Sequence, residues 1–367
     1  MTFDDLSAVY NEWLDLREDP DLLRLMFGGV IANRFDGLPV WMMMIMPSGG
    51  GKSELLMSLS GAETIVAVSS LTPAALASGY GTENSLLFRL DGKVLVIKDM
   101  SSTTSVKADD RMLLFSWLRD AYDGELNRST GKMTINWKGK FGMMVGATLA
   151  IEQSRTTESM LGERFMYVRP RMRIKTEEQL NAVLKNGARK TEMKALLRDA
   201  AGKFLDTYQT PSMEAQRDKL PKSVIDIAKK AAVALVSARS SVSRSERERF
   251  VDFPVELTEM PTRLMEQFML VGMAMQSIGA GEEELIRTMK RFLLDSIPYI
   301  RMVVIDALVG GVERVTDIAN RINMSDSYTR RVCEDLHRLG VLDCTANGAS
   351  YKLKLEILSS ASRRSVS

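Results

Sequence analysis

A glycine-rich segment of this chain carries the residue types that bind phosphate groups. Residues 46–54 have the sequence MPSGGGKSE, and its second half matches the G-x-x-x-x-G-K-[ST] phosphate-loop pattern. Consecutive glycines let backbone N–H groups converge on phosphate oxygens. In such a loop the lysine would reach the β- and γ-phosphates, and the serine would hold Mg²⁺. We therefore expect ATP and Mg²⁺ to bind at Pro47, Ser48, Gly49, Gly50, Gly51, Lys52, Ser53 and Glu54.

The sequence around this loop departs from the pattern in one place. Met46 stands where glycine or alanine is usual, which could reshape the first turn. The alternative interpretation is a glycine-rich turn with a chance Gly-Lys-Ser. The apolar run before the loop (residues 40–46) and the expected helix after it (residues 54–59) favour the phosphate loop.

A phosphate loop needs an acidic group for the metal, and Asp99 is the candidate. It follows the apolar run at residues 94–97, so it would end a buried strand and hold Mg²⁺-bound water. The alternative is an ordinary turn acid at the surface. In the usual arrangement a glutamate comes next, but here Met100 does. Glu54 and Glu125 are then the candidates for the catalytic base.

Composition narrows the class of protein. The chain has 367 residues, 45% of them apolar, with a net charge of only +2, so any nucleic-acid surface must be a local patch. Its N-terminus is unlike a secretion signal. The sequence contains no stretch of 18 uncharged apolar residues, so we expect no membrane span. Cys333, Cys344 and His337 are too few for a usual zinc site. We expect a reduced, cytoplasmic protein.

The apolar pattern predicts an α/β fold in the first half of the chain. Short apolar runs alternate with helical patterns, which favours a parallel sheet with helices on both faces. The expected strands are residues 40–46, 64–68, 94–97 and 141–147. A helical pattern with a break near Pro20 covers residues 3–33, and another covers residues 109–122.

Strand signals stop near residue 176, and helical patterns continue to about residue 296. Two further helices are expected at residues 300–308 and 316–322, and Ser325 can cap a third that runs to Leu339. A ribbon with Asn347-Gly348 at its turn then gives the element order of a winged helix. The expected organisation is an N-terminal helical segment (1–37), a P-loop ATPase core (38–175), a helical lid and connection (176–296), a winged helix (297–358) and a disordered tail (359–367).

The succession of motifs resembles a known family. PSGGGKSE, LTPAALASG, VLVIKDM, LRDAYDGE, WKGKFG and LGERF follow one another as in AAA+ helicases of phages and mobile elements. These are similar to the minichromosome maintenance helicases, including the C-terminal winged helix. The resemblance covers roughly residues 38–357 and depends mostly on order and spacing. It implies an AAA+ P-loop core with a parallel sheet, an all-α lid and a winged helix. It also implies a ring, expected to be a hexamer, in the cytoplasm of a bacterial host.

The resemblance also implies roles for three polar residues. Thr148 would be the sensor at the end of a central strand, reading the γ-phosphate or orienting water. Arg164 resembles the arginine finger that reaches a neighbouring subunit's nucleotide, and Arg263 resembles the sensor arginine of the lid. The alternatives are a threonine that ends a strand, a surface ion-pair arginine and an ordinary arginine at a helix start.

Two segments are candidates for contact with DNA. Residues 123–139 can form a hairpin, and in related helicases such a hairpin grips the DNA backbone in the channel of the ring. Lys132 near its tip is the first candidate, with Arg128 and Lys138 behind it, and phosphate contacts of this kind would be independent of sequence. The alternative for Lys132 is an exposed turn lysine.

The third helix of the winged helix is the second candidate. Tyr328, Val332, Leu336 and Leu339 fall on one helical stripe expected to face the core. Arg330 and Arg331 fall outward and could contact DNA, although Glu334 and Asp335 interrupt the basic patch. Contact with protein is the open alternative.

The function expected from these features is an ATP-dependent DNA helicase, translocase or origin-melting motor for phage or mobile-element replication. It would act as a hexameric ring on single-stranded or forked DNA, with other replication proteins as partners. One alternative is an ATP-dependent DNA-binding regulator or helicase loader that does not unwind DNA. Another is a remodelling ATPase that does not act on nucleic acid.

Overall fold

The computed structural model describes residues 1–14, 16, 18–77, 85–100, 107–130, 133–153, 164–171, 177, 187, 189–242, 260–345 and 348–360. The chain divides into two compact units. The first contains Met1–Leu220 and Leu270–Gly281, and the second contains Pro221–Met269 and Glu282–Ser367. Within the described residues, no helix has both the length and the apolar composition to cross a membrane.

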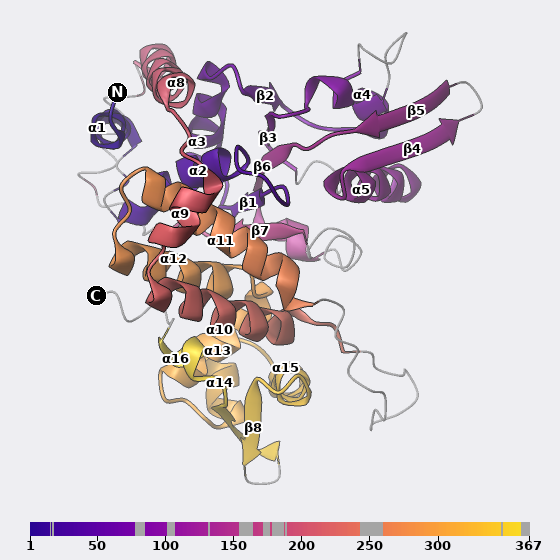
Figure 1. Cartoon of the computed structure of the whole chain (residues 1–367). Helices are drawn as coiled ribbons and strands as arrows, with labels where there is room; N and C mark the ends of the chain where they lie inside the picture. The colour runs from indigo at the N-terminus through magenta and orange to yellow at the C-terminus, as the bar shows by residue number, and fades with distance from the viewer. Residues whose placement is uncertain are drawn as a thin grey trace. The chain divides into compact units, whose positions relative to one another are not determined.

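A five-stranded sheet forms the centre of the first unit, in the order β2-β3-β6-β1-β7 (Figure 1). Every neighbouring pair is parallel, which confirms the predicted α/β class with a parallel sheet. The strands are β1 (Trp41–Ile45), β2 (Ile65–Val68), β3 (Val94–Ile97), β6 (Gly142–Ala147) and β7 (Phe165–Val168). Strand β7 was not among the expected strands.

The strands form where apolar residues run without interruption, because a parallel sheet is covered on both faces. Every residue of β1, β3, β6 and β7 is buried. In register, Ile45 of β1 lies beside Ala147 of β6, and Met44 lies beside Val168 of β7. The loops after these strands therefore leave the sheet on one side. We call that side the carboxyl end of the sheet and the opposite side the amino end.

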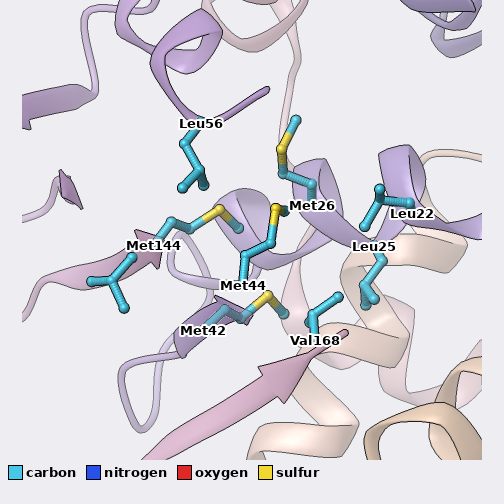
Figure 2. Close-up of a pocket in the computed structure, with 9 residues that line it drawn as sticks. Leu22, Leu25, Met26, Met42, Met44, Leu56, Met144 and Val168 are labelled. Carbon is cyan, nitrogen blue, oxygen red and sulfur yellow. The ribbon is translucent and has the colours of Figure 1, made fainter. Parts of the chain in front are cut away.

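Helix α2 (Pro20–Ala32) packs closely on the strands. A Cβ at Gly29 would lie only 2.5 Å from the sulfur of Met42. The helix can therefore lie this close to β1 because residue 29 has no side chain. A small apolar pocket remains between helix and sheet, where methionines from α2, β1 and β6 point toward one another (Figure 2). Flexible thioethers suit such irregular gaps. The pocket is lined by Leu22, Leu25, Met26, Met42, Met44, Leu56, Met144, Val145 and Val168.

Two helices hold the short helix α3 (Lys52–Ser58), which begins directly after the glycine-rich loop. From α1 (Phe3–Leu14), the buried Tyr10 hydroxyl lies 2.5 Å from the hydroxyl of Ser58. From α8 (Lys190–Thr207), Lys190 forms an ion pair of 3.1 Å with Glu54. The other described helices that lie wholly within this unit are α4 (Pro73–Ala77), α5 (Ala108–Tyr122), α9 (Met213–Lys219) and the 3-10 turns η1 (Leu59–Gly61), η3 (Leu87–Arg89) and η5 (Leu149–Gln153).

A separate antiparallel hairpin, β4 (Glu125–Thr130) and β5 (Met133–Lys138), precedes β6 and runs beside α5 (Figure 1). One face is apolar and buried, with Leu126, Ile135 and Trp137 in the core. At its base, the Gly139 N–H donates to the Gly124 carbonyl over 3.1 Å, and the chain then enters β6. The hairpin therefore starts at the amino end of the sheet, and its existence confirms the prediction for residues 123–139.

The second unit is mainly helical. It contains α10 (Lys222–Arg239), α12 (Glu282–Asp295) and the first part of α11 (Pro261–Ser277). Between α10 and α12, apolar side chains fill the contact. One ion pair in this unit is buried as well: Arg291 Nε lies 3.2 Å from Asp295 Oδ2, and both side chains are at most 4% exposed.

The second unit ends in three helices and a two-stranded ribbon. These are α13 (Tyr299–Val309), α14 (Val315–Ile322), α15 (Asp326–Arg338), β8 (Leu342–Thr345) and β9 (Ser350–Leu353). The Ser325 hydroxyl accepts the Tyr328 N–H over 3.4 Å, which confirms the predicted cap.

Two expectations for this segment are wrong. Tyr328 is 45% exposed instead of buried, because Thr329, Val332, Cys333 and Leu336 form the inward face. The expected disordered tail begins too early, since α16 (Glu356–Ser360) includes Ser359 and Ser360 and is held by the fully buried Leu358.

Candidate functional site

The glycine-rich loop joins the carboxyl end of β1 to α3. Its first residues, Pro47 to Gly49, are exposed. Gly49 has a φ of 80° and Gly51 a φ of 84°, the left-handed region that favours glycine. A Cβ at either position would meet nothing within 4 Å, so backbone conformation and not crowding requires glycine here. The Leu55 N–H donates to the Gly51 carbonyl over 3.0 Å and starts the helix.

Met46, the departure from the usual loop pattern, belongs to the core. It is 2% exposed, and its N–H donates to the Ala147 carbonyl over 3.0 Å. Met46 therefore extends β1 by one residue before the loop turns away. The unusual side chain is therefore part of the core and not of the exposed stretch from Pro47 to Gly49.

Lys52 and Asp99 meet at the carboxyl end of the sheet. Lys52 Nζ lies 3.8 Å from Asp99 Oδ1, and the side chains are 8% and 44% exposed. Asp99 follows β3, while β6 separates β3 from β1. The Lys52 stem crosses β6 at Gly146, where a Cβ would lie 2.9 Å from Lys52 Cδ and 2.5 Å from the Lys98 carbonyl oxygen. Gly146 therefore makes room for the lysine, a function that the loop pattern does not indicate.

Thr148 lies at the same end of the sheet. It follows β6, the strand between the phosphate-loop strand and the Asp99 strand, and is half-buried. Its carbonyl accepts the Ile151 N–H over 3.1 Å, at the start of the turn η5. The structure thus brings Lys52, Asp99 and Thr148 to the carboxyl end of the sheet.

The oxygen donors at this end suit Mg²⁺. Ser53 is the second residue of α3, directly after Lys52, whose ammonium lies beside the Asp99 carboxylate. Magnesium keeps several waters and takes one or two protein oxygens together with substrate phosphates, so Ser53 and Asp99 fit it. No group of three or more His, Cys, Asp or Glu side chains that could hold a metal occurs among the described residues.

The two candidate bases have different surroundings. Burial opposes ionisation of Glu54, but hydrogen bonding and the charge of Lys190 outweigh it and hold the pKa of this carboxyl below its ordinary value. Glu125 pairs with Lys138 over 2.6 Å at the base of the hairpin. Because that base lies at the amino end of the sheet, Glu125 does not fit the role of base at the phosphate loop.

Arg164 also lies at the amino end, immediately before β7. Its guanidinium is 3.2 Å from Asp123 and 5.5 Å from the centre of the Tyr122 ring, and the residue is 9% exposed. Arg164 comes before the first residue of β7, whereas the phosphate loop comes after the last residue of β1. The full length over which these two parallel strands pair lies between them. Arg164 is therefore separated from the loop of its own chain. Its role as an arginine finger stays a prediction.

The predicted DNA contacts of the hairpin have partners within the chain. Arg128 donates to Asp120 (Nε–Oδ2, 3.0 Å) and to Ser116 (2.9 Å), which ties β4 to α5. Lys138 is 76% exposed and pairs with Glu125. Lys132 lies outside the described residues. Of these three, Lys138 has the most exposed side chain that the structure describes.

The remaining predicted residues belong to the second unit. Arg263 is the third residue of α11 and half-buried. Arg330 and Arg331 are both exposed on α15. Arg330 donates to the Gly348 carbonyl over 2.6 Å and so holds the turn of the ribbon against the helix. The sensor and DNA-binding roles of these three residues stay predictions.

Sequence reasoning missed a buried ion pair at the carboxyl end of the sheet. Glu152 in η5 contacts Arg169, which directly follows β7, and the side chains are only 7% and 6% exposed. The guanidinium carbon lies 5.9 Å from the centre of the Tyr167 ring. Neither residue belongs to a motif, so no signal in the sequence pairs them.

No family model matches this chain, and no curated protein matches it. Any functional assignment therefore depends on the residues of the site described above.

Proposed function

We propose that this chain binds and hydrolyses ATP at the carboxyl end of its parallel sheet. The observation that carries this proposal is the meeting of Lys52 with Asp99 beside an exposed loop that has two left-handed glycines. Backbone N–H groups in such a loop form an anion-binding concavity. A buried lysine next to it supplies the positive charge that phosphates need.

Each residue of the site has a separate role in the proposed reaction. Lys52 exchanges part of its contact with Asp99 for phosphate oxygens and stabilises the charge that develops during transfer. Thr148 holds the attacking water or a phosphate oxygen with its hydroxyl. Mg²⁺, held by Ser53 and by water on Asp99, would neutralise charge on the phosphates. Glu54 remains the candidate base, although its ion pair with Lys190 makes it a weak one.

The strand arrangement supports an AAA+ core. The resemblance implies a central strand that carries the sensor, and β6 is the third of the five strands. It also implies a hairpin before that strand, which β4 and β5 supply. Three helices followed by a ribbon, with an added bridge between Arg314 and Ser350, support a winged helix at the end of the chain.

The position of Arg164 supports a ring. Because this arginine lies at the opposite end of the sheet from its own phosphate loop, any contact with a nucleotide would be with that of another subunit. Arginine fingers that act in this way stabilise transition-state charge. We propose a homo-oligomeric, hexameric ring in which each site is completed by a neighbour.

The hairpin and the C-terminal helices favour DNA as the substrate of the motor. We propose an ATP-driven DNA helicase, translocase or origin-melting motor of a phage or mobile element. The exposed outer face of the hairpin, which carries Asn127, Thr134, Asn136 and Lys138, is polar and available for contact. A regulator or helicase loader would share these features but would not separate strands.

The experiment is ATP hydrolysis measured across protein concentration, with and without single-stranded and forked DNA, beside a Lys52→Ala control. Hydrolysis that rises with both concentration and DNA supports an assembling DNA motor, and strand separation is then assayed on the fork. Hydrolysis without strand separation favours the regulator. A wild-type protein that hydrolyses ATP no faster than the Lys52→Ala control removes the proposal altogether.

A further inference from the structure

The ion pair between Glu152 and Arg169 joins two segments that the sheet keeps apart. Glu152 lies in the turn after β6, and Arg169 directly follows β7, while β1 lies between these two strands. Strands two positions apart in a sheet are separated by roughly 9–10 Å. The contact must therefore pass across the carboxyl end of β1, where Met46 leads into the phosphate loop.

The pair is an unlikely choice if stability alone is required. Both side chains are nearly fully buried. Transferring two charges from water into the protein interior costs free energy that offsets much of their mutual attraction. Apolar residues of similar volume usually pack equally well. Buried charge beside a catalytic site instead favours a functional role. The turn that holds Glu152 begins at Thr148, whose carbonyl accepts the Ile151 N–H.

We propose that Glu152 and Arg169 are positioning residues for ATP hydrolysis. Their contact fixes the turn after Thr148 against β7, across the start of the phosphate loop, and so sets where the Thr148 hydroxyl stands relative to the bound phosphates. This inference rests on the proposed ATPase function. It assigns the pair to the hydrolytic step and not to nucleotide binding.

The test replaces both charges by apolar side chains, Glu152→Leu with Arg169→Met. The second unit offers a matched control, because Arg291 and Asp295 form an equally buried ion pair. The control variant is Arg291→Met with Asp295→Leu. For each protein we would measure thermal unfolding, the affinity for a fluorescent ADP analogue, and kcat and KM for ATP. Glu152→Gln, which keeps the side-chain shape, replaces the double variant if that protein does not fold.

The expected result separates kcat from binding. The Glu152/Arg169 variant should unfold cooperatively and bind ADP within about threefold of wild type, whereas its kcat should fall on the order of tenfold to a hundredfold, as for a misplaced catalytic group. The Arg291/Asp295 variant should keep its kcat. In a protein that already carries Thr148→Ala, the Glu152/Arg169 change should lower kcat little further, because the pair is proposed to act by positioning the Thr148 hydroxyl.

Two results would overturn the inference. A Glu152/Arg169 variant with wild-type kcat would make the pair purely structural, and losses that multiply with Thr148→Ala would separate the pair from that residue. Failure of the wider proposal looks different. In that case the wild-type protein itself shows no hydrolysis that depends on Lys52.

Discussion

The ammonium nitrogen of Lys52, the first residue of α3, lies 3.8 Å from a carboxylate oxygen of Asp99, which follows β3. The strand that leads to Lys52, β1, is separated from β3 by β6. A buried lysine beside a half-exposed carboxylate is poised to exchange that partner for phosphate. We expect Lys52→Ala to lose nucleotide binding. Asp99→Asn should still bind ATP but hydrolyse it at least about a hundredfold more slowly, since it removes charge that acts on the transition state.

Equilibrium binding of a fluorescent ATP analogue, together with phosphate release, distinguishes the two variants. Asp109→Asn, on the exposed first turn of α5, is a matched change of an acid to an amide. Asp99→Asn with the hydrolysis rate of this control would contradict the role of Asp99.

Gly146 is expected to support hydrolysis by leaving room for Lys52. In Gly146→Ala the new Cβ would lie 2.9 Å from Lys52 Cδ and 2.5 Å from the Lys98 carbonyl oxygen, so the lysine or the strand must shift. We expect kcat/KM for ATP to fall by about tenfold to a hundredfold, because small displacements of a catalytic group are costly. Gly281→Ala is the control, since a Cβ there meets nothing within 4 Å. Equal activity of the two variants would show that the close approach at Gly146 is unimportant.

Arg164→Ala should leave nucleotide binding intact and lower hydrolysis by about a thousandfold if the arginine serves a neighbour. Mixing provides the decisive measurement. Arg164→Ala subunits keep a complete phosphate loop, and Lys52→Ala subunits keep the arginine, so mixed assemblies should regain part of the activity that each variant lacks. Absence of recovery in assemblies proven to contain both variants would argue that Arg164 acts within its own chain, where it contacts Asp123 and Tyr122.

The ion pair between Glu54 and Lys190 should make stability depend on pH in the acid range. The folded-state pKa of Glu54 lies below its ordinary value of 4.5, so the stabilisation is complete above that pH and is lost as the pH falls through the folded pKa. Lys190→Met should cost less than about 1 kcal/mol at neutral pH, because Lys190 is largely exposed. The difference from wild type should vanish in acid.

Urea unfolding measured from pH 7 to pH 3 tests this dependence. Lys203→Met removes an exposed pair with Asp199 and serves as the control. A Lys190→Met deficit that does not change with pH would show that the lysine acts by packing alone.

The two thiols should react at different rates. Burial raises the pKa of Cys333 to about 12, while Cys344 is exposed on β8. Since the thiolate is the reactive form, an aromatic disulfide reagent at pH 8 should label one thiol in the native protein and two after denaturation. Cys344→Ser should abolish the fast phase. Two fast thiols in the native protein would contradict the packing of α15 against its neighbours.

The sequence predicted the strands that combine an uninterrupted apolar run with a neighbouring motif. Residues 94–97 are the clearest case, since they match β3 and end next to Asp99. Strand β7 is as short as β3 but has no motif residue at its carboxyl end, so its four apolar residues, FMYV, could not be distinguished from another kind of buried segment. On α15 the predicted stripe is confirmed at Val332, Leu336 and Leu339, which are buried. Tyr328 is the exception, because Thr329 takes the inward position in the first turn, and helical spacing alone does not decide between two adjacent residues at the edge of a stripe.

The site was predictable where chemistry is local in sequence. Lys52 and Ser53 follow from a motif, and Asp99 follows from a strand that ends in an acid. The Gly146 approach and the Glu152–Arg169 contact were not predictable, because each depends on which strands become neighbours. Strand order is decided by packing of the whole sheet, and that information is spread over the chain.

The methionines that fill the space between α2 and the sheet could be observed by NMR spectroscopy. Met26, Met42, Met44 and Met144 converge beside Leu56 of α3, the helix that begins at Lys52 (Figure 2). Their terminal methyl groups can be labelled with carbon-13 and give sharp, separate NMR signals even in large assemblies. A protein prepared in this way would report from within its own core when a nucleotide binds, without a fluorescent analogue or an added probe.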